Sequence, residues 1–179
     1  MELSALPVTA PSFQDQVSRL FEEHFSRLYR VVARLTGEPE LASDVVQEAF
    51  VRLVQRGSLP DDPAAWLISV AMNLVRNEKT TRGRRLRLLT PERGAETLAD
   101  PPPSPDEAMS SEASRLRVRE ALDRIPERER RLLLLQSEGY RYREIAAALK
   151  LNEKSVGVLL ARARRMFRES YEEDSDASR

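Results

Sequence analysis

The sequence predicts an all-α protein built from two small helical domains joined by a flexible acidic linker. Apolar residues recur at intervals of three and four along most of the chain, which is the period of helices packed on one side. Glycine is scarce, at 6 of 179 residues, and no alternating strand pattern stands out. A proline-rich acidic segment separates two such helical stretches.

The first domain is predicted over residues 13–90, after a flexible N-terminus of residues 1–12. Its first long helix stops at Gly37, because glycine commonly follows a helix terminus. Pro39 suits the first turn of a second helix, which ends at Gly57.

A third helix is expected to begin at Asp62 and Pro63, which suit an N-cap and a first helical turn. This helix continues into a basic stretch at residues 79–87. The side chains expected to face inward are Trp66, Val70, Ala71 and Leu74.

Residues 91–112 contain five of the eleven prolines and many acidic residues, so they are predicted to form an extended linker. A second helical domain is predicted over residues 113–170, and residues 171–179 form an acidic tail. The helices expected in the second domain cover residues 116–125, 126–138, 142–149 and 153–169.

The last two of these helices, joined by a turn at Lys150-Leu151-Asn152, have the form of a helix-turn-helix. One helix of such a motif crosses the DNA backbone and the other enters the major groove. The interior between them is predicted to consist of Ile145, Ala146, Leu149, Val156, Leu160 and Ala163. The opposite side of the last helix is cationic, which favours DNA binding over the alternative of an ordinary solvated face.

Composition restricts the chemistry. Without cysteine, the chain has no disulfide or thiolate metal site, and His24 is its one histidine. With no cysteine and one histidine, we expect no metal site. No glycine-rich phosphate-binding loop stands out, so we expect no ATP use and no cofactor. An enzyme is the weakest interpretation, because acidic pairs such as Glu22-Glu23 and Asp61-Asp62 are typical of solvated surfaces.

The formal net charge of +0 conceals segregated charges. Basic residues dominate at 76–87 and again at 115–168, and the proline-rich linker between them is acidic. Two basic blocks around an acidic spacer favour two contacts with a polyanion.

Several motifs occur in a specific order. Those of the first domain are Asp44-Val45-Val46-Gln47-Glu48-Ala49-Phe50-Val51-Arg52-Leu53 and Ala65-Trp66-Leu67-Ile68-Ser69-Val70-Ala71-Met72-Asn73. Those of the second are Leu122-Asp123-Arg124-Ile125-Pro126-Glu127-Arg128-Glu129-Arg130, Glu144-Ile145-Ala146 and Arg162-Ala163-Arg164. In this order, residues 13–170 resemble an RNA polymerase sigma factor of the extracytoplasmic-function (ECF) type, in the sigma-70 family.

The resemblance implies that the first domain is sigma region 2, the second is the helix-turn-helix of sigma region 4, and the protein is cytoplasmic. It also implies binding to the β′ clamp helices and the β flap of core RNA polymerase. The implied core-binding residues are Asp44, Gln47, Glu48, Arg52 and Gln55. Glu48 and Arg52 also have the spacing of a simple surface ion pair, which is the alternative for these two.

The resemblance further implies that the first domain binds the opened minus-ten element, whose melting is driven by capture of the separated strand. The implied minus-ten residues are Leu59, Asp62, Asn73, Arg76, Asn77, Lys79 and Arg82. We interpret Trp66 as a packing residue. The implied minus-thirty-five residues, facing duplex DNA, are Arg141, Arg143, Lys154, Ser155, Val158, Arg162, Arg164 and Arg165.

The chain departs from the family pattern where base contacts are expected. Gly157-Val158-Leu159 replaces a more polar stretch, Arg141 stands at a usual Ser or Thr cap, and Lys150 stands at a usual glycine. Asn77 occupies a position that is often aspartate. We therefore expect binding to the minus-thirty-five element with weak base discrimination and strong salt dependence.

Two other interpretations remain open at this point. A helix-turn-helix regulator of duplex DNA that is not a polymerase subunit explains the second domain and leaves the first without a role. A helical adaptor that binds only proteins leaves the basic blocks unexplained. An anti-sigma protein is a further possible partner by resemblance, and we expect no insertion into a membrane.

Overall fold

The computed structural model describes residues 11–88 and 105–177, and it describes the backbone alone at residues 79–88, 105–111, 113 and 174–177. Within these ranges the chain forms α-helices and no strand, as predicted. The helices are Phe13–Thr36 (α1), Pro39–Arg56 (α2), Pro63–Leu88 (α3), Pro105–Arg124 (α4), Glu127–Ser137 (α5), Tyr142–Leu149 (α6) and Glu153–Ala177 (α7).

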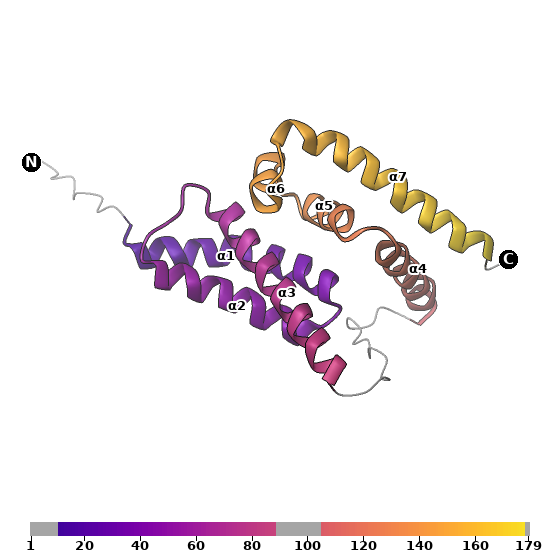
Figure 1. The fold of residues 1–179 in the computed structure, drawn as a ribbon, viewed down its shortest axis with the longest axis horizontal. Coiled ribbons are helices and arrows are strands. Elements are labelled where there is room, and N and C mark those ends of the chain that lie inside the picture. Colours follow the sequence, from indigo (N-terminus) through magenta and orange to yellow (C-terminus); the bar gives the residue numbers. More distant parts are fainter. Residues whose placement is uncertain (1–10, 89–104, 178–179) are drawn as a thin grey trace, which may run out of the picture.

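Helices α1, α2 and α3 form one group, and α4 to α7 form a second group beside it (Figure 1). In the first group α1 begins with a capping box, in which Ser12 and Asp15 satisfy each other's backbone N–H groups. Gly37 and Gly57 end α1 and α2 in the left-handed region, each with a φ of 72°. The predicted ends of these two helices are thereby confirmed.

The inward face of α3 differs from the prediction. Trp66, Val70 and Leu74 are only half-buried, although Ala71 is fully buried as expected. The most buried large side chains of α3 are Leu67, Ile68, Met72 and Val75. The buried residues form one face of α3 that is rotated from the predicted face, because α3 contacts α6 as well as α1 and α2.

The chain is also more helical around the predicted linker. α4 begins at Pro105, inside the segment 91–112 that we expected to be extended. Proline fits the first helical turn, and the two acidic residues that follow it, Asp106 and Glu107, favour a helix N-terminus. α7 likewise extends to Ala177, beyond the predicted end at residue 169.

The helix-turn-helix is confirmed. α6 has the predicted bounds, and Ile145, Ala146, Val156, Leu160 and Ala163 are buried, whereas Leu149 is half-buried. Within the described ranges, no helix is both long enough and apolar enough to cross a membrane.

The two groups of helices are in contact. α1 packs against α5, and α3 packs against α6. One cluster of buried apolar residues runs from Leu28 and Val32 in the first group to Leu135 and Ile145 in the second. We call this packing of α1 and α3 on α5 and α6 the closed arrangement.

Lys150 lies in the left-handed region, with φ 56° and ψ 47°, and ends α6 where a glycine would be unstrained. A side chain in this conformation costs about 1 kcal/mol. Lys150→Gly is therefore expected to stabilise the protein by up to about 1 kcal/mol. Part of this gain is lost because glycine raises the conformational entropy of the unfolded chain. Thermal unfolding should show a midpoint roughly 1–3 °C higher. Lys150→Ala, which removes the charge and keeps the strain, should not show the increase; an equal gain in both variants would contradict this explanation.

His24 lies on α1 with only 6% of its surface exposed, and its Nδ1 atom has no hydrogen-bond partner. Burial lowers the pKa of His24 below 6.5, Arg27 lowers it further, and the carboxylates of Glu23, Glu144 and Asp62 oppose this without reversing it. The unfolded chain therefore binds a proton that the folded chain resists, so the free energy of unfolding falls as pH drops below about 6.5. Thermal unfolding from pH 7.5 to 5.5 should show this decline, and His24→Gln should flatten it; an unchanged slope would contradict the assignment to His24.

Candidate polymerase-binding and promoter-binding surfaces

The residues predicted to bind the polymerase core lie together on the solvent side of α2. Asp44, Gln47 and Gln55 are exposed, and the opposite face of the helix is buried. Glu48 accepts a hydrogen bond from Arg52 Nε at 2.8 Å, and both side chains are nearly half exposed. Glu48 and Arg52 therefore form a surface ion pair and can also belong to the binding face. The ion pair leaves both charged groups open to a partner.

Beside this polar face is an apolar hollow that the sequence analysis missed. It lies between α1 and α2 and has a volume of about 730 Å³. Phe21, Val51 and Val54 are 43%, 45% and 55% exposed, and Gln47 and Gln55 line the same hollow. Exposed apolar side chains framed by polar ones are typical of protein-binding surfaces. The sequence signal was present, since Val51 and Val54 fall off the buried stripe of α2.

A second, smaller hollow between α2 and α3 is acidic. It has a volume of about 330 Å³. The carboxylates around it are Glu38, Glu40, Asp44, Glu48 and Glu78. Because these charges repel phosphate, this side of the first group suits a protein partner better than DNA.

The predicted minus-ten residues divide into two sets. Asn73, Arg76 and Asn77 are exposed on one side of α3, and Arg76 donates a hydrogen bond to the Asn73 side chain at 3.1 Å. Lys79 and Arg82 lie further along α3, where their side chains fall outside the described residues.

The other minus-ten set lies at the start of α3, 11 residues from Asn73, which is roughly 16 Å along a helix. Leu59 is half-buried and packs against the apolar core. Asp62 caps α3 by accepting from the Ala65 N–H at 3.1 Å, as predicted. Its other oxygen lies 3.3 Å from Arg143 Nε, a residue predicted for the minus-thirty-five element.

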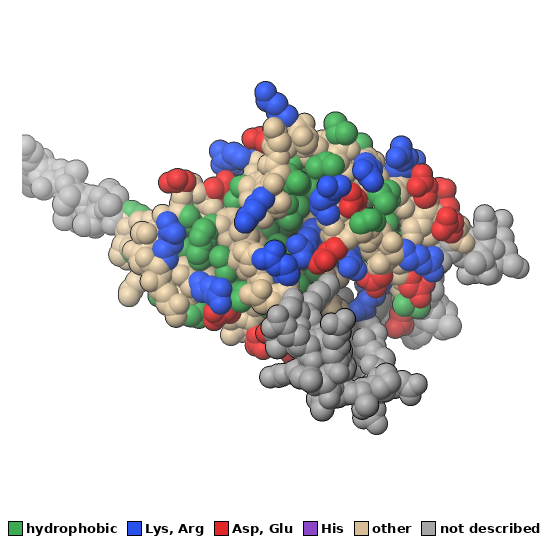
Figure 2. Space-filling model, in the orientation of Figure 1, with side chains coloured by type: hydrophobic (Ala, Val, Ile, Leu, Met, Phe, Trp, Pro, Cys, Tyr) green, Lys and Arg blue, Asp and Glu red, His purple; other side chains and the backbone are tan. Residues whose placement is uncertain are grey.

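Most of the predicted minus-thirty-five residues lie on the exposed side of α7. Val158 is 74% exposed, and Lys154, Ser155, Arg162 and Arg165 are exposed around it. Figure 2 shows basic side chains along the upper edge of the molecule, over α6 and the first turns of α7, and acidic ones near the end of α7. The basic residues of α7 thus lie between Lys154 and Arg168, in the part of the helix that begins at the turn and is expected to meet DNA.

Two predicted residues of this set contact residues outside their own helix, whereas Arg165 pairs with Glu169 within α7. Arg164 lies at the edge of the exposed side of α7 and donates to the Gln136 side chain of α5 at 2.7 Å. Arg143 forms the ion pair with Asp62, whereas Arg141 is exposed at the start of α6. Lys154, Val158 and Arg165 thus share one open row on α7. Arg143 and Arg164 lie outside this row and have partners on other elements.

A buried carboxylate supports this surface from behind. Glu129 is 3% exposed and pairs with Arg128 at 2.6 Å. Burial raises the pKa of Glu129, but the hydrogen bonds it accepts and the charges of Arg128 and Arg162 outweigh burial, so the net pKa lies below its usual value. Glu129 therefore stays ionised and holds negative charge beneath the cationic helix.

Comparison with known proteins matches the same two groups of helices. Residues 20–85 match Sigma-70 region 2, and residues 115–167 match Sigma-70 region 4. The chain is 31% identical over 160 residues to the ECF RNA polymerase sigma factor SigL of Mycobacterium tuberculosis, covering 86% of this chain and 88% of SigL. It is also 31% identical to the probable RNA polymerase sigma factor RfaY of Xanthomonas campestris, of which it spans 42%.

Two solved structures share the fold. The sigma factor RpoE of Bartonella quintana, in complex with the anti-sigma factor NepR, has a TM-score of 0.67 and 18% identity, covering 88% of this chain and 97% of that one. CnrH, in complex with the cytosolic domain of CnrY, has a TM-score of 0.63 and 22% identity, covering 90% of each chain.

The match to region 2 accounts for the first group of helices, which a helix-turn-helix regulator leaves without a role, and the match to region 4 accounts for the basic block that an adaptor leaves unexplained. Region 2, region 4 and a relative matched over most of both chains together give the assignment. The chain therefore belongs to the extracytoplasmic-function sigma factors of the sigma-70 family, which are initiation factors of RNA polymerase.

Proposed function

We propose that this chain binds core RNA polymerase through α2, carries it to promoters through α3 and α7, and helps to melt the minus-ten region. The observation that carries the proposal is that three separate exposed surfaces have three different chemistries. The α2 surface is acidic and apolar, the Asn73 side of α3 is polar, and the start of α7 is cationic. Such a division suits one protein partner and two forms of DNA.

The polymerase surface is proposed to combine the polar residues of α2 with the apolar hollow beside them. Phe21, Val51 and Val54 supply apolar area, and buried apolar contacts with a polar rim are the usual anatomy of a specific interface. The expected partners are the β′ clamp helices for this surface and the β flap for region 4.

The minus-ten surface is proposed to hold the separated strand. Asn73 and Asn77 donate to and accept from base edges, while Arg76 and the basic end of α3, with Lys79 and Arg82, contact phosphates. Leu59 and Asp62 join this surface once Asp62 is released from Arg143. Binding of the strand supplies the energy for opening, so the protein needs no enzymatic activity of its own. The proposed place of action is the cytoplasm, where core polymerase and promoters are found.

The minus-thirty-five surface is proposed to approach duplex DNA with a bare patch of Gly157, Val158 and Ala161. Val158 contacts thymine methyl groups or follows groove shape, and Lys154, Arg162 and Arg165 contact phosphates. Arg141 and Ser155 lie at the edges of this patch, and Arg143 and Arg164 join it by leaving their present partners.

We further propose an anti-sigma protein as a partner. In the similar solved structures, the sigma factor RpoE is bound to the anti-sigma factor NepR, and CnrH is bound to the cytosolic domain of CnrY. Among the described residues, the exposed apolar hollow beside α2 is a surface that suits a further protein partner.

Added to core polymerase, the purified chain is expected to give discrete start sites in run-off transcription.

The charge-swapped variant Glu48→Arg/Arg52→Glu keeps an ion pair at the same helical spacing, so its stability should change by only a few tenths of a kcal/mol. Its affinity for core polymerase should nevertheless fall about tenfold or more, because the partner meets inverted charges. Its binding to promoter duplex alone should not change. Equal affinity of the swapped and wild-type chains for core would remove this surface from the proposal.

Gly157 offers a test of the bare patch. A Cβ atom at Gly157 would lie 3.6 Å from the Tyr142 ring, which is ordinary contact, so Gly157→Ala should fit and raise stability by about 1 kcal/mol. The added methyl group should keep α7 further from the groove, so affinity for minus-thirty-five duplex should fall several-fold. Urea unfolding and a duplex-binding titration measure the two effects. A more stable variant that binds duplex unchanged would show that close approach at Gly157 does not occur.

A further inference from the structure

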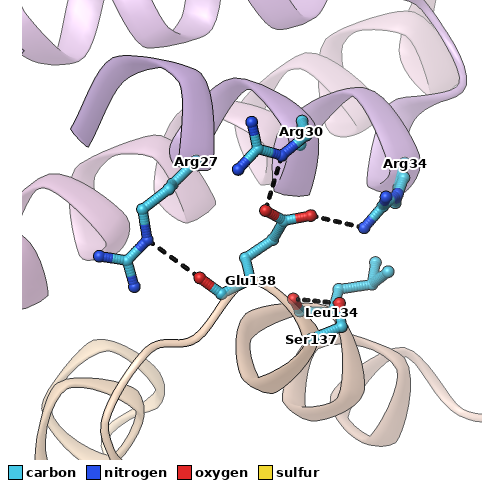
Figure 3. A network of polar contacts seen from close by, with 6 residues as sticks. All are labelled: Arg27, Arg30, Arg34, Leu134, Ser137 and Glu138. Atoms are coloured by element: carbon cyan, nitrogen blue, oxygen red, sulfur yellow. Dashed lines mark hydrogen bonds and ion pairs between the residues drawn. The ribbon is translucent and has the colours of Figure 1, made fainter. Parts of the chain in front are cut away.

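The closed arrangement is held by a cluster around Glu138, which we call the Glu138 cluster: Glu138, Arg27, Arg30 and Arg34 (Figure 3). Glu138 follows α5, and the three arginines share one face of α1 at a spacing of three and four. Arg30 Nε lies 2.7 Å from one carboxylate oxygen, and an Arg34 terminal nitrogen lies 2.6 Å from the other. Arg27 Nε donates to the Glu138 backbone carbonyl at 2.9 Å.

The Glu138 carboxylate is nearly buried. Its side chain is 7% exposed, whereas Arg30 and Arg34 are about half exposed. A carboxylate removed from water needs charged donors on both oxygens, and here both donors come from the other group of helices. An orientation that buries Glu138 without these two arginines would leave its charge unpaired, so the desolvation of Glu138 makes the contact specific.

Arg27 adds a second contact at the same place. Its guanidinium lies over the Tyr140 ring, 4.3 Å from the centroid, and Tyr140 is 4% exposed. Burial raises the pKa of Tyr140 to about 12, so the ring remains neutral under the arginine throughout the physiological range. Tyr140 lies directly before the helix-turn-helix, so the Glu138 cluster fixes the orientation of α6.

This orientation brings one edge of each proposed DNA surface together. α6, the helix that crosses the DNA backbone in a helix-turn-helix, packs on α3. Asp62 of the minus-ten set and Arg143 of the minus-thirty-five set are paired at 3.3 Å. On a promoter the two elements lie about 25 base pairs apart, which is roughly 85 Å of duplex at 3.4 Å per base pair. One chain cannot span that distance while Asp62 and Arg143 touch.

The polymerase surface is in a different position. Within the described residues α2 contacts α1 and α3 and no helix of the second group. Its polar face and apolar hollow are therefore open in the closed arrangement. Core polymerase can thus bind α2 before the two groups of helices separate.

We propose that the Glu138 cluster holds the free chain in an autoinhibited state in which it cannot engage both promoter elements. The proposal rests on the proposed function, because that function assigns Asp62 and Arg143 to DNA. Opening breaks the contacts of Glu138 with α1 and frees both residues together. Core polymerase that contacts both groups of helices in the open form would shift the population of the chain toward that form.

Two variants test the proposal with opposite changes of charge. Glu138→Gln raises the net charge by one, and Arg30→Gln/Arg34→Gln lowers it by two. Through charge alone the first would strengthen DNA binding and the second would weaken it. If both variants open the chain, each should enlarge the radius of gyration in solution scattering and lower the Kd for DNA. The DNA is a promoter fragment with a paired minus-thirty-five element and a minus-ten element held open by mismatched bases, bound here without core; its sequence is one from which the wild-type chain and core polymerase initiate. We expect a decrease in Kd of roughly tenfold, as loss of a charge-assisted contact predicts when the closed form dominates.

Asp123→Asn is the matched control. It changes the charge as Glu138→Gln does, but its partner, Arg130, lies in the same group of helices. It should leave both the scattering and the Kd close to wild type, and circular dichroism should show equal helicity in all four proteins. Compact variants, or opposite shifts of Kd that follow net charge, would overturn the proposal. Expanded variants with an unchanged Kd would retain the cluster as an interdomain contact and remove its inhibitory role. Absence of any start site with core polymerase would instead overturn the proposed function, and with it the inhibitory role.

Discussion

A carboxylate taken out of water determines how the two halves of this protein meet. Glu138 is nearly buried, and its oxygens are satisfied by Arg30 and Arg34 from the other half of the chain. An unpaired buried charge is costly, so few orientations of the helix-turn-helix on α1 are compatible with this contact. The packing of α6 on α3 and the pairing of Asp62 with Arg143 accompany the same orientation.

The surfaces proposed for the polymerase and for DNA consequently differ in availability. The α2 face and its apolar hollow are open, as is the exposed row on α7 from Lys154 to Arg165. At the start of α3, Asp62 is only 25% exposed and is paired with Arg143 of α6, so these two residues are engaged with each other. This difference suggests a sequence of events in initiation. The chain first binds its protein partner through α2, and Asp62 and Arg143 are released for DNA afterwards.

Two residues of the helix-turn-helix are not optimal for the fold. Lys150 adopts a left-handed conformation that suits glycine, and Gly157 stands in a helix where alanine would fit. Both lie near the cationic start of α7. Local departures from the best residue for folding are common at functional surfaces, and here they coincide with the end of the protein proposed to approach duplex DNA.

The sequence by itself determined the helices of both halves, because their apolar period and their glycine and proline boundaries are local. It also placed the interior of the helix-turn-helix, and its ordered motifs identified the family. It did not find the start of α4 or the buried face of α3, which depends on contact with α6, a helix distant in the chain. The hollow beside Phe21 and the pairing of Asp62 with Arg143 likewise required the tertiary structure. Such contacts depend on how separate helices are oriented, and local periodicity carries no information about that orientation.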